Sequence, residues 1–599
     1  MKAKQYSFAA LAMRSISMQF KASPGLSPIH QGMAVVHALM WIAGIVTTQM
    51  LFDAISRAAA GTAGFADCVP PLLMLAGASF GQQIMSGVWN FTAGVLSGRT
   101  VGHIRTLLHR KLQRVDPARF EDTAFLDSLN KAREGVEAVP YVCMILLMLA
   151  SFYLVYFGLM GAYFFWLQPL LIIALLLAFV PAVLAQMVRV KVFTKLEEQS
   201  APLRREYEYY QKTLCDREYY KETRILGAFR FFQGLFSDAL RLFTRKTWKA
   251  ERKITLLSLL LDLAAFAGMG VSTYILFTAT MDGRVSVGAF AAGYAALNQI
   301  FSQMQEVVTW HIGNVSNNVG KVNNLIRMLD MPERTGARGT PNFSKGVAAA
   351  DVTFTYPGRE EPAVSGVSLN IADGETVAIV GENGAGKSTL MRLLTGVYRP
   401  SEGQVTVGGL DTAETAPSSL YEGTSGVFQK YQRYKMTLEE NITISDVQDG
   451  VSGGAVTPRI EAALREADVK LDEGIGLDTM LSPEFDGVDL SGGQWQRIAI
   501  SRGLYRPNGF IVLDEPTSAI DPIEETRIYT QFQRLAKGKC AVVVTHRLGS
   551  AKLAHRIIVM DGGRIVDMGT HEELMTRPGK YADMWAAQAQ WYERAELVV

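Results

Sequence analysis

This sequence has no closely spaced cysteine pair, only a small net charge, and no continuous apolar run of the signal-peptide type at its N-terminus. Its four cysteines, Cys68, Cys143, Cys215 and Cys540, are far apart and form no CxxC pair, so neither a disulfide framework nor a zinc site is expected. The net charge of +2 over 599 residues argues against nucleic acid as a partner, because nucleic-acid-binding proteins concentrate basic residues. Arg14 and Lys21 interrupt the N-terminal apolar residues, which predicts an amphipathic helix on a membrane surface rather than a signal peptide.

Long apolar stretches dominate the first half of the chain. The mean hydropathy of +0.12 is high for a soluble protein, and residues 139–188 contain no Asp, Glu, Lys or Arg. Helices of soluble proteins rarely lack a polar face, and a bilayer-crossing helix takes about 20 residues. We therefore expect an α-helical membrane domain with six transmembrane helices, at Met33–Ile55, Cys68–Val95, Val136–Phe157, Phe164–Met187, Ile254–Phe277 and Val285–Val308.

Basic residues are concentrated in two connections, after the second and after the fourth expected span. Arg105, Arg110 and Arg114 are among those in the first connection, and Arg204 and Arg205 are among those in the second. The positive-inside rule then places both connections and both termini in the cytoplasm. Their amphipathic pattern predicts helices that continue from the spans and end in short turns able to touch another domain.

The composition and hydrophobic pattern of the sequence change after residue 330. The segment MPERTGARGTPNFSKG has the proline, glycine and charge of a linker. Beyond it, short β-branched runs such as TVAIVG, FIVLDE and AVVVTH alternate with helical patterns, which predicts an α/β domain with a largely parallel sheet. We expect a membrane domain at residues 1–330, a linker at 331–346 and the α/β domain at 347–599.

A phosphate-binding loop is predicted at TVAIVGENGAGKSTL, where an apolar run precedes G-x-x-x-x-G-K-[ST] and a helical pattern follows it. The glycines allow a tight turn whose backbone N–H groups surround a polyphosphate. Lys387 would reach the β- and γ-phosphates, and Ser388 would hold Mg²⁺. The residues expected to contact nucleotide here are Gly381, Asn383, Gly384, Gly386, Lys387, Ser388 and Thr389. These positions make the domain a P-loop nucleotide-binding domain.

Two adjacent acids end the apolar run in FIVLDEPTSAID. Successive residues of a strand point to opposite sides, so the two acids can do different work. Asp514 suits the Mg²⁺ shell, and Glu515 suits orienting or deprotonating the attacking water. The alternative is that the two acids only cap a strand. The phosphate-binding loop in the same domain makes this alternative less favoured.

The segment DLSGGQWQRIAISR carries a more specific resemblance. LSGGQ before a helix, followed by the acid-ending strand, resembles the signature of ABC-transporter ATPases. The resemblance implies that Ser491, Gly492, Gly493 and Gln494 close over an ATP held by the phosphate loop of a second domain. A helix N-terminus is a suitable anion site for that role.

Four further positions match the family pattern in order and spacing. Tyr356 in FTYPG resembles the aromatic that stacks on adenine, and Gln429 resembles the residue that links Mg²⁺ to the membrane domain. Asp521 resembles the loop at the subunit boundary, and His546 in VVVTHR resembles the γ-phosphate sensor. The resemblance therefore implies Glu515, His546 and Gln429 as catalytic residues, Ser388, Gln429 and Asp514 as metal ligands, and ATP and Mg²⁺ as cofactors.

The resemblance extends to the membrane half, where residues 116–135 and 214–228 are similar to the two cytoplasmic coupling regions of exporters. It implies a half-transporter of the bacterial cytoplasmic membrane that pairs with a second chain, most simply as a homodimer, and works by alternating access. ATP must then bind the closed state more tightly than the open one.

The substrate is less well defined by the sequence. SPEFDGVD before LSGGQ and KYQRYKMTLEENI after Gln429 resemble bacterial peptide and bacteriocin exporters more than lipid or multidrug exporters, and no N-terminal cysteine-peptidase domain is expected. An importer of the same architecture and a membrane-anchored regulatory ATPase are the alternatives. Polar residues inside the expected spans either line a pathway or bond to neighbouring helices. They are His37, Gln49, Asn90, Asp262, Asn298, Gln299 and Gln303.

Overall fold

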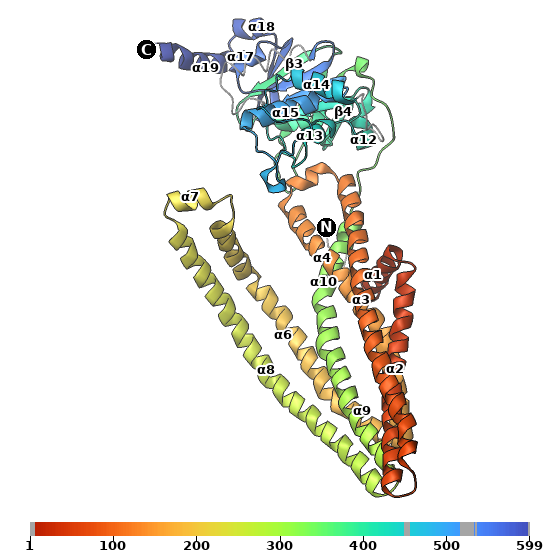
Figure 1. Cartoon of the computed structure of the whole chain (residues 1–599). Helices are drawn as coiled ribbons and strands as arrows, with labels where there is room; N and C mark the ends of the chain where they lie inside the picture. The colour runs from red at the N-terminus through yellow and green to blue at the C-terminus, as the bar shows by residue number, and fades with distance from the viewer. Residues whose placement is uncertain (1–5, 448–455, 515–531, 533–535, 597–599) are drawn as a thin grey trace. The chain divides into compact units, whose positions relative to one another are not determined.

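The computed structural model describes residues 6–447, 456–514, 532 and 536–596, which form two compact units. The first unit comprises residues 1–110 and 128–330, and the second comprises residues 111–127 and 331–599. Each unit has its own hydrophobic core. The first unit is helical and the second is α/β, which agrees with the fold class expected from the sequence (Figure 1).

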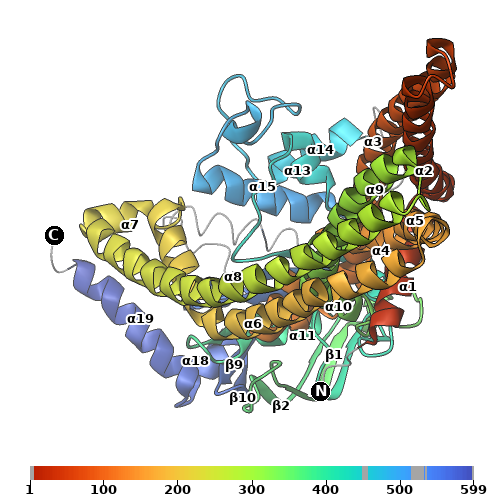
Figure 2. The same cartoon turned by 90° about the horizontal axis from the view of Figure 1, so that it is seen from below.

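The helical unit contains several helices that are much longer than a bilayer crossing requires. α6 and α8 have 46 and 53 residues, run side by side in both views and are joined at one end by the short helix α7 (Figures 1 and 2). The π-helical segments η3 and η4 interrupt two of the helical runs. The helices are α1 (Phe8–Ala22), α2 (Leu26–Ala59), α3 (Val69–Arg114), α4 (Thr123–Met148), η3 (Leu149–Tyr153), α5 (Leu154–Leu167), α6 (Leu170–Cys215), α7 (Tyr220–Ile225), α8 (Phe229–Met281), α9 (Val287–Glu306), η4 (Val307–Ile312) and α10 (Gly313–Leu329).

The core of the helical unit lies where α2, η3, α5, α6, α8 and α9 meet. Tyr156, Phe164 and Leu276 are fully buried there, and small residues of α9 such as Ala292 let the helices approach closely. One of the first backbone N–H groups of α9 finds a partner in α2, because the N–H of Gly288 donates to Asp53 Oδ1 at 3.0 Å. A Cβ added to Gly288 would lie 2.4 Å from that oxygen, so this close contact requires glycine.

Four helical stretches of the described residues are long and apolar enough to cross a membrane, at Leu26–Ala59, Thr123–Leu167, Leu170–Arg189 and Phe229–Met281. They contain the first, third and fifth expected spans. The fourth expected span, Phe164–Met187, was placed too early, because α5 ends at Leu167 and the helix that forms this span begins at Leu170. The second and sixth expected spans lie on α3 and α9, which are long helices but less apolar. Amide side chains lower their hydropathy, including Gln82 and Asn90 in α3 and Asn298 and Gln303 in α9.

The second unit contains two sheets. A four-stranded antiparallel sheet has the order β2-β1-β4-β5, and a six-stranded sheet has the order β10-β9-β3-β8-β7-β6. All pairs of the larger sheet are parallel except β9 with β10, as the apolar runs predicted. The strands are β1 (Val347–Phe354), β2 (Val364–Ile371), β3 (Thr376–Gly381), β4 (Glu402–Val407), β5 (Leu410–Asp411), β6 (Thr424–Val427), β7 (Phe510–Asp514), β8 (Cys540–Val544), β9 (Arg556–Asp561) and β10 (Arg564–Gly569).

Helices of this unit contact the larger sheet, among them α15 at β6, α11 at β8 and α17 at β3, while α13 and α14 pack against α15. β3, β7 and β8 are buried along their whole length, so their carboxyl ends are held rigidly where the loops begin. The described helices are α11 (Lys387–Leu394), α12 (Pro417–Leu420), α13 (Leu438–Thr443), α14 (Val456–Glu466), α15 (Gly492–Tyr505), α17 (Leu548–Ala551), α18 (His571–Thr576) and α19 (Lys580–Glu596).

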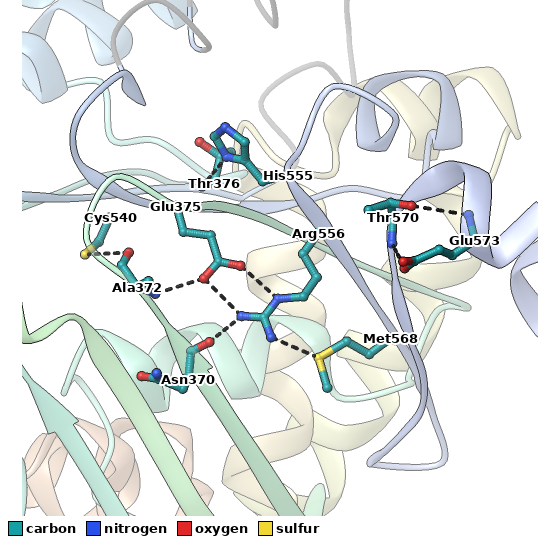
Figure 3. Close-up of polar contacts among 10 residues, drawn as sticks. All are labelled: Asn370, Ala372, Glu375, Thr376, Cys540, His555, Arg556, Met568, Thr570 and Glu573. Atoms are coloured by element: carbon teal, nitrogen blue, oxygen red, sulfur yellow. Dashed lines mark hydrogen bonds and ion pairs between the residues drawn. The ribbon is translucent and has the colours of Figure 1, made fainter.

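The amino ends of β3 and β9 are fixed by a polar cluster (Figure 3). Arg556 makes a two-pronged ion pair with Glu375, with N–O distances of 2.8 and 3.0 Å, and also donates to the carbonyl of Asn370. His555 Nδ1 accepts the N–H of Thr376 at 2.9 Å. These contacts lie at the opposite end of the strands from the phosphate loop, so they contribute to the scaffold rather than to the nucleotide site.

The segment that follows the helical unit is irregular but anchored. The backbone N–H of Arg334 donates to the carbonyl of Arg114 at 2.6 Å. Its guanidinium, in a residue only 5 % exposed, donates to the carbonyls of Val397, Gly396 and Thr412 at 2.9, 2.7 and 3.3 Å. The segment predicted to be a linker, 331–346, therefore contains one residue, Arg334, that is buried in the second unit.

Candidate functional site

The predicted phosphate loop lies between the buried strand β3 and helix α11. Gly381, Gly384 and Gly386 have φ values of 151°, 87° and 94°, in the region that favours glycine. A Cβ on Gly386 would lie 2.5 Å from the carbonyl oxygen of Ala363. Gly381 and Gly386 are thus required by both backbone angle and close approach, and Gly384 is required by its backbone angle.

Lys387 and Ser388, at the start of α11, are oriented by the ends of the neighbouring strands. The Lys387 ammonium donates to the carbonyls of Gly381 and Glu382, at 2.9 Å each, and the residue is only 6 % exposed. Ser388 Oγ donates to Asp514 Oδ1, at the carboxyl end of β7, at 3.3 Å. The structure therefore brings together the phosphate loop and the first acid of FIVLDE, which are far apart in the sequence.

A cavity of about 370 Å³ opens over this loop. Tyr356 and Gln429 contribute to its wall, and Tyr356 Oη is hydrogen-bonded to Thr389 Oγ1 at 2.9 Å. The tyrosine ring packs edge-on against Phe354, with the ring centroids 5.1 Å apart. The lining residues are Tyr356, Ala363, Asn383, Gly384, Gly386, Lys387, Ser388, Thr389 and Gln429. All of these except Ala363 were candidates from the sequence.

The oxygen donors in this cavity and beside it fit Mg²⁺. Hydroxyl, carboxylate and amide oxygens are the ligands that Mg²⁺ prefers, and it usually keeps several waters and substrate phosphates as further ligands. Ser388 Oγ and Asp514 Oδ1 are already neighbours, and Gln429 lies in the same wall. No group of three or more His, Cys, Asp or Glu able to hold a metal occurs in the described part of the chain.

The LSGGQ segment forms the N-terminus of α15. Ser491 caps the helix, its Oγ accepting the N–H of Gln494 at 3.3 Å, while Gln494 Oε1 accepts the N–H of Ser491 at 2.9 Å. Ser491, Gly492 and Gly493 are exposed, and a Cβ on either glycine would meet nothing within 4 Å. None of the four signature residues lines the cavity over the phosphate loop of the same chain.

The structure describes one of the three remaining site candidates, His546. His546 is half-buried just after β8, and its carbonyl accepts a hydrogen bond from Gln588 Nε2 at 2.6 Å. It does not belong to the cavity lining. Glu515 and Asp521 lie outside the described residues.

Three residues that the sequence did not single out connect α11 to residues 111–127. Glu121 Oε1 accepts hydrogen bonds from Tyr398 Oη at 2.8 Å and from Arg392 at 3.3 Å, and Arg392 also donates to Tyr398 Oη at 2.9 Å. Tyr398 is 2 % exposed, and Ala118 joins the same core. The sequence marked 116–135 as a coupling segment, but no signal in it identified the partners of Glu121.

Some polar residues of the expected spans bond to neighbours instead of remaining available. Trp41 Nε1 donates to His37 Nε2 at 3.1 Å, and Tyr163 Oη donates to Gln49 Oε1 at 3.0 Å. The Asn298 amide donates to the carbonyl of Tyr294 at 2.9 Å. These contacts favour a structural role for His37, Gln49 and Asn298.

The comparisons with known proteins agree with this geometry. Residues 364–518 match the family model described as ABC transporter, and residues 32–204 match that described as ABC transporter transmembrane region. The chain belongs to the ABC transporter family. This ABC protein thus carries the membrane region and the ATP-binding region fused in one polypeptide, as the resemblance implied.

Two relatives of this ABC protein are named for different functions. It is 29 % identical to the subtilin transport ATP-binding protein SpaT of Bacillus subtilis, over 85 % of this chain and 83 % of that protein. It is 30 % identical to the ATP-dependent lipid A-core flippase of Thiobacillus denitrificans, over 62 % of this chain and 63 % of the flippase. The match therefore spans just under two thirds of that relative's length.

A solved structure extends the likeness to nearly the whole chain. A bacterial Atm1-family ABC exporter with ATP bound shares 24 % identity and a TM-score of 0.75, with 93 % of this chain and 98 % of the other covered. At this identity the likeness establishes the fold of the ABC protein and leaves its substrate open.

Proposed function

We propose that the chain is one half of a dimeric ATP-driven exporter of the bacterial cytoplasmic membrane. The observation that carries this proposal is a division of the nucleotide site. Tyr356, Lys387 and Gln429 surround one cavity, whereas the signature residues at the start of α15 are exposed and absent from its lining. A second copy of the chain, presenting its own α15, supplies the missing wall.

The residues of the cavity have separate roles in holding ATP. Backbone N–H groups of the phosphate loop and of α11 bind the phosphate oxygens. The Lys387 ammonium exchanges the carbonyls of Gly381 and Glu382 for phosphate oxygens, which are stronger, charged acceptors. Ser388, Asp514 and Gln429 would hold Mg²⁺, which neutralises charge that develops on the phosphates. Tyr356 stacks on the base.

The hydrolytic step follows from the resemblance at positions outside or beside the cavity. Glu515 orients the attacking water and accepts its proton, and His546 contacts the γ-phosphate. Ser491, Gly493 and Gln494 of the partner copy contribute the positive end of a helix to the same phosphate. The resemblance assigns Asp521 to the loop at the boundary between the two copies. ATP binding thus closes the dimer, and hydrolysis reopens it.

The membrane assignment is residues 1–330 with six spans, the linker 331–346 and the nucleotide-binding domain 347–599, with both termini cytoplasmic. Large exposed apolar side chains on the long helices support this assignment, including Leu176 on α6, 61 % exposed, and Leu260 on α8, 65 % exposed. Exposed apolar surface of this extent is rare in soluble monomers. Residues 116–135 and 214–228 would pass closure to the spans, which alternate between two openings.

A peptide or amphipathic small molecule is the proposed substrate. Similarity to a subtilin transport protein over most of both chains supports a peptide. Similarity to lipid A-core flippases favours a lipid exporter as the second candidate. The same architecture also suits a multidrug exporter, an importer or a regulatory ATPase, and the transport assay below distinguishes these activities.

The shared nucleotide site is tested by mixing two differently tagged chains. In a pair of Lys387→Ala with Gly493→Asp, one composite site carries both defects and the other is intact, so about half of the ATPase activity remains. In a pair of wild type with the double variant, each composite site carries one defect and activity is lost. The opposite pattern would mean that each site is built from a single chain.

Transport is tested in inside-out proteoliposomes with a labelled peptide panel, a lipophilic dye and a fluorescent lipid. Glu515→Gln is the matched control, because it should retain ATP binding and lose turnover. Uptake that needs Glu515 supports export and identifies the substrate class. ATP-dependent loss of preloaded substrate would support the importer instead, and robust ATPase activity without movement would support the regulator.

A further inference from the structure

A second cavity, of about 240 Å³, lies in the helical unit where α1, α2, α3 and α4 meet. None of its lining residues was a site candidate in the sequence, and none belongs to the nucleotide site. Gln19 and His30 form part of its floor, while Gly94, Glu137 and Tyr141 are exposed at its mouth. The cavity is therefore deep on one side and accessible on the other.

The floor contains polar groups with unused hydrogen-bonding capacity. Gln19 is 3 % exposed, and its carboxamide has no hydrogen-bond partner among the described residues. His30 is 2 % exposed; its Nδ1 lies 2.8 Å from Thr92 Oγ1, and its ring stacks on Trp89 with centroids 5.1 Å apart. Because the carboxamide of Gln19 lines the cavity and is not among the side-chain atoms sealed from solvent, it can bond to a polar ligand that enters.

A negative charge lines the mouth of the cavity, and a positive charge lies just outside the lining. Glu137 is the one charged residue of the lining, all of which lies in the described part of the chain. Its Oε1 is 2.5 Å from a guanidinium nitrogen of Arg105, which is not part of the lining. Both side chains of this pair are about 60 % exposed, and exposed ion pairs are weak. A ligand with a cation inside the cavity and an anion beside Arg105 matches this arrangement.

The cavity also lies at a defined level of the helical unit. Gln19 is in the last turn of the amphipathic helix α1, and His30 is in the second turn of α2, where the first span begins. Given the proposed membrane placement, on which this inference rests, that level is the cytoplasmic headgroup region. Taking about 30 Å³ for each water-sized group, the cavity holds about eight non-hydrogen atoms.

We propose that this cavity binds the ammonium end of a zwitterionic phospholipid headgroup of the ethanolamine type. The ammonium lies among Glu137, Gln19 and Ser97, which offer carboxylate, amide and hydroxyl oxygens, and the phosphate lies beside Arg105. The ammonium nitrogen and its two carbons are about three non-hydrogen atoms, so they fit in the cavity and leave room for bridging waters. The bound lipid would fix α1 against the first three long helices.

The chain offers matched variants for a test. A Cβ on Gly94 meets nothing within 4 Å, so Gly94→Leu fills the mouth without strain. Gly98 lies one turn further along α3, is equally open and is not part of the lining, so Gly98→Leu is its control. Glu137→Gln removes the charge in the cavity, and Glu134→Gln, one turn earlier on α4 and outside the lining, is the corresponding control.

The full-length protein is reconstituted in nanodiscs of phosphatidylglycerol, with or without phosphatidylethanolamine, and retained lipid is counted by native mass spectrometry. Wild type should retain phosphatidylethanolamine about tenfold over phosphatidylglycerol, Gly94→Leu and Glu137→Gln should lose most of that preference, and both controls should keep it. Dodecylamine added to phosphatidylglycerol discs tests the other source of an ammonium head. Retention of the amine with no ethanolamine preference would overturn the lipid assignment, and equal retention by wild type and both cavity variants would overturn the site.

ATPase activity of the same samples separates this inference from the proposed function. Normal ATPase activity with no headgroup preference removes the lipid site alone. If the wild-type protein hydrolyses no ATP but keeps the headgroup preference, the exporter assignment is contradicted and the lipid site is supported.

Discussion

Replacing Arg334 by alanine should destabilise the second unit more than replacing any exposed residue near it. The guanidinium is held by three carbonyl oxygens, of Gly396, Val397 and Thr412. Burial lowers the pKa of Arg334 from its ordinary value, but an arginine stays protonated at neutral pH. The side chain is therefore a buried cation whose charge is distributed over backbone acceptors.

The size of the effect follows from what the substitution leaves behind. Each buried carbonyl that loses its donor costs about 1–3 kcal/mol, whereas removing a buried cation relieves part of its desolvation penalty. We expect a net loss of about 2–4 kcal/mol for Arg334→Ala. For a domain of this size, each kcal/mol lowers Tm by about 2–4 °C, so the midpoint should fall by about 4–16 °C.

The assay is thermal inactivation of ATPase activity in the purified full-length chain. Arg334→Lys should also be destabilising, because an ammonium cannot reproduce the planar fork of donors. Arg338→Ala is the control, since Arg338 is exposed in the same segment. A midpoint for Arg334→Ala within about 1 °C of wild type would refute the view that Arg334 anchors this segment.

Four further outcomes are expected. Gly386→Ala should abolish binding of a fluorescent ATP analogue, because its φ of 94° and the 2.5 Å approach of a Cβ to Ala363 oppose any side chain. Burial raises the pKa of Cys540 to about 11, so maleimide at neutral pH should modify exposed Cys215 and spare Cys540 until denaturation; Cys215→Ser should remove the fast reaction. Chelation of Mg²⁺ should stop ATPase activity while peptide-backbone circular dichroism stays unchanged. Hydrogen bonding from Lys111 lowers the pKa of Glu333 from its ordinary value, so this contact persists at neutral pH. Its stabilising effect is lost as the pH falls through the lowered pKa, so Glu333→Gln should flatten the dependence of Tm on pH on the acid side of the ordinary glutamate pKa.

The nucleotide site could be predicted from sequence because its parts are local. The glycines, Lys387 and Ser388 occur within eight residues, and their backbone requirements are written directly in the motif. The capping box of Ser491 and Gln494 is likewise a spacing of three residues, which the sequence also contains. Even Asp514, distant in the chain, was predictable because parallel strands bring their carboxyl ends to one edge.

Contacts between residues far apart in the chain were not predictable in this way. Nothing in the composition of residues 331–346 distinguishes Arg334 from the exposed Arg338, because the difference lies in which carbonyls the fold presents to each. The spans show the same limit, since α3 and α9 are long helices whose amide side chains weaken the hydropathy signal. Hydropathy counts the side chains of a helix but cannot tell which of them face neighbouring helices.

The link from nucleotide to the coupling segment can nevertheless be argued from distances within the second unit. α11 begins at Lys387, in the wall of the phosphate cavity, and carries Arg392 little more than one turn later. Arg392 and Tyr398 both donate to Glu121, and Tyr398 is almost fully buried. If the Glu121 carboxylate moved separately from α11, the buried Tyr398 hydroxyl would lose a hydrogen-bond partner. A displacement of α11 on ATP binding would therefore carry residues 116–121 with it. Glu121→Ala should accordingly keep ATPase activity while lowering the amount of substrate moved for each ATP, a ratio that loss of folding alone would leave unchanged.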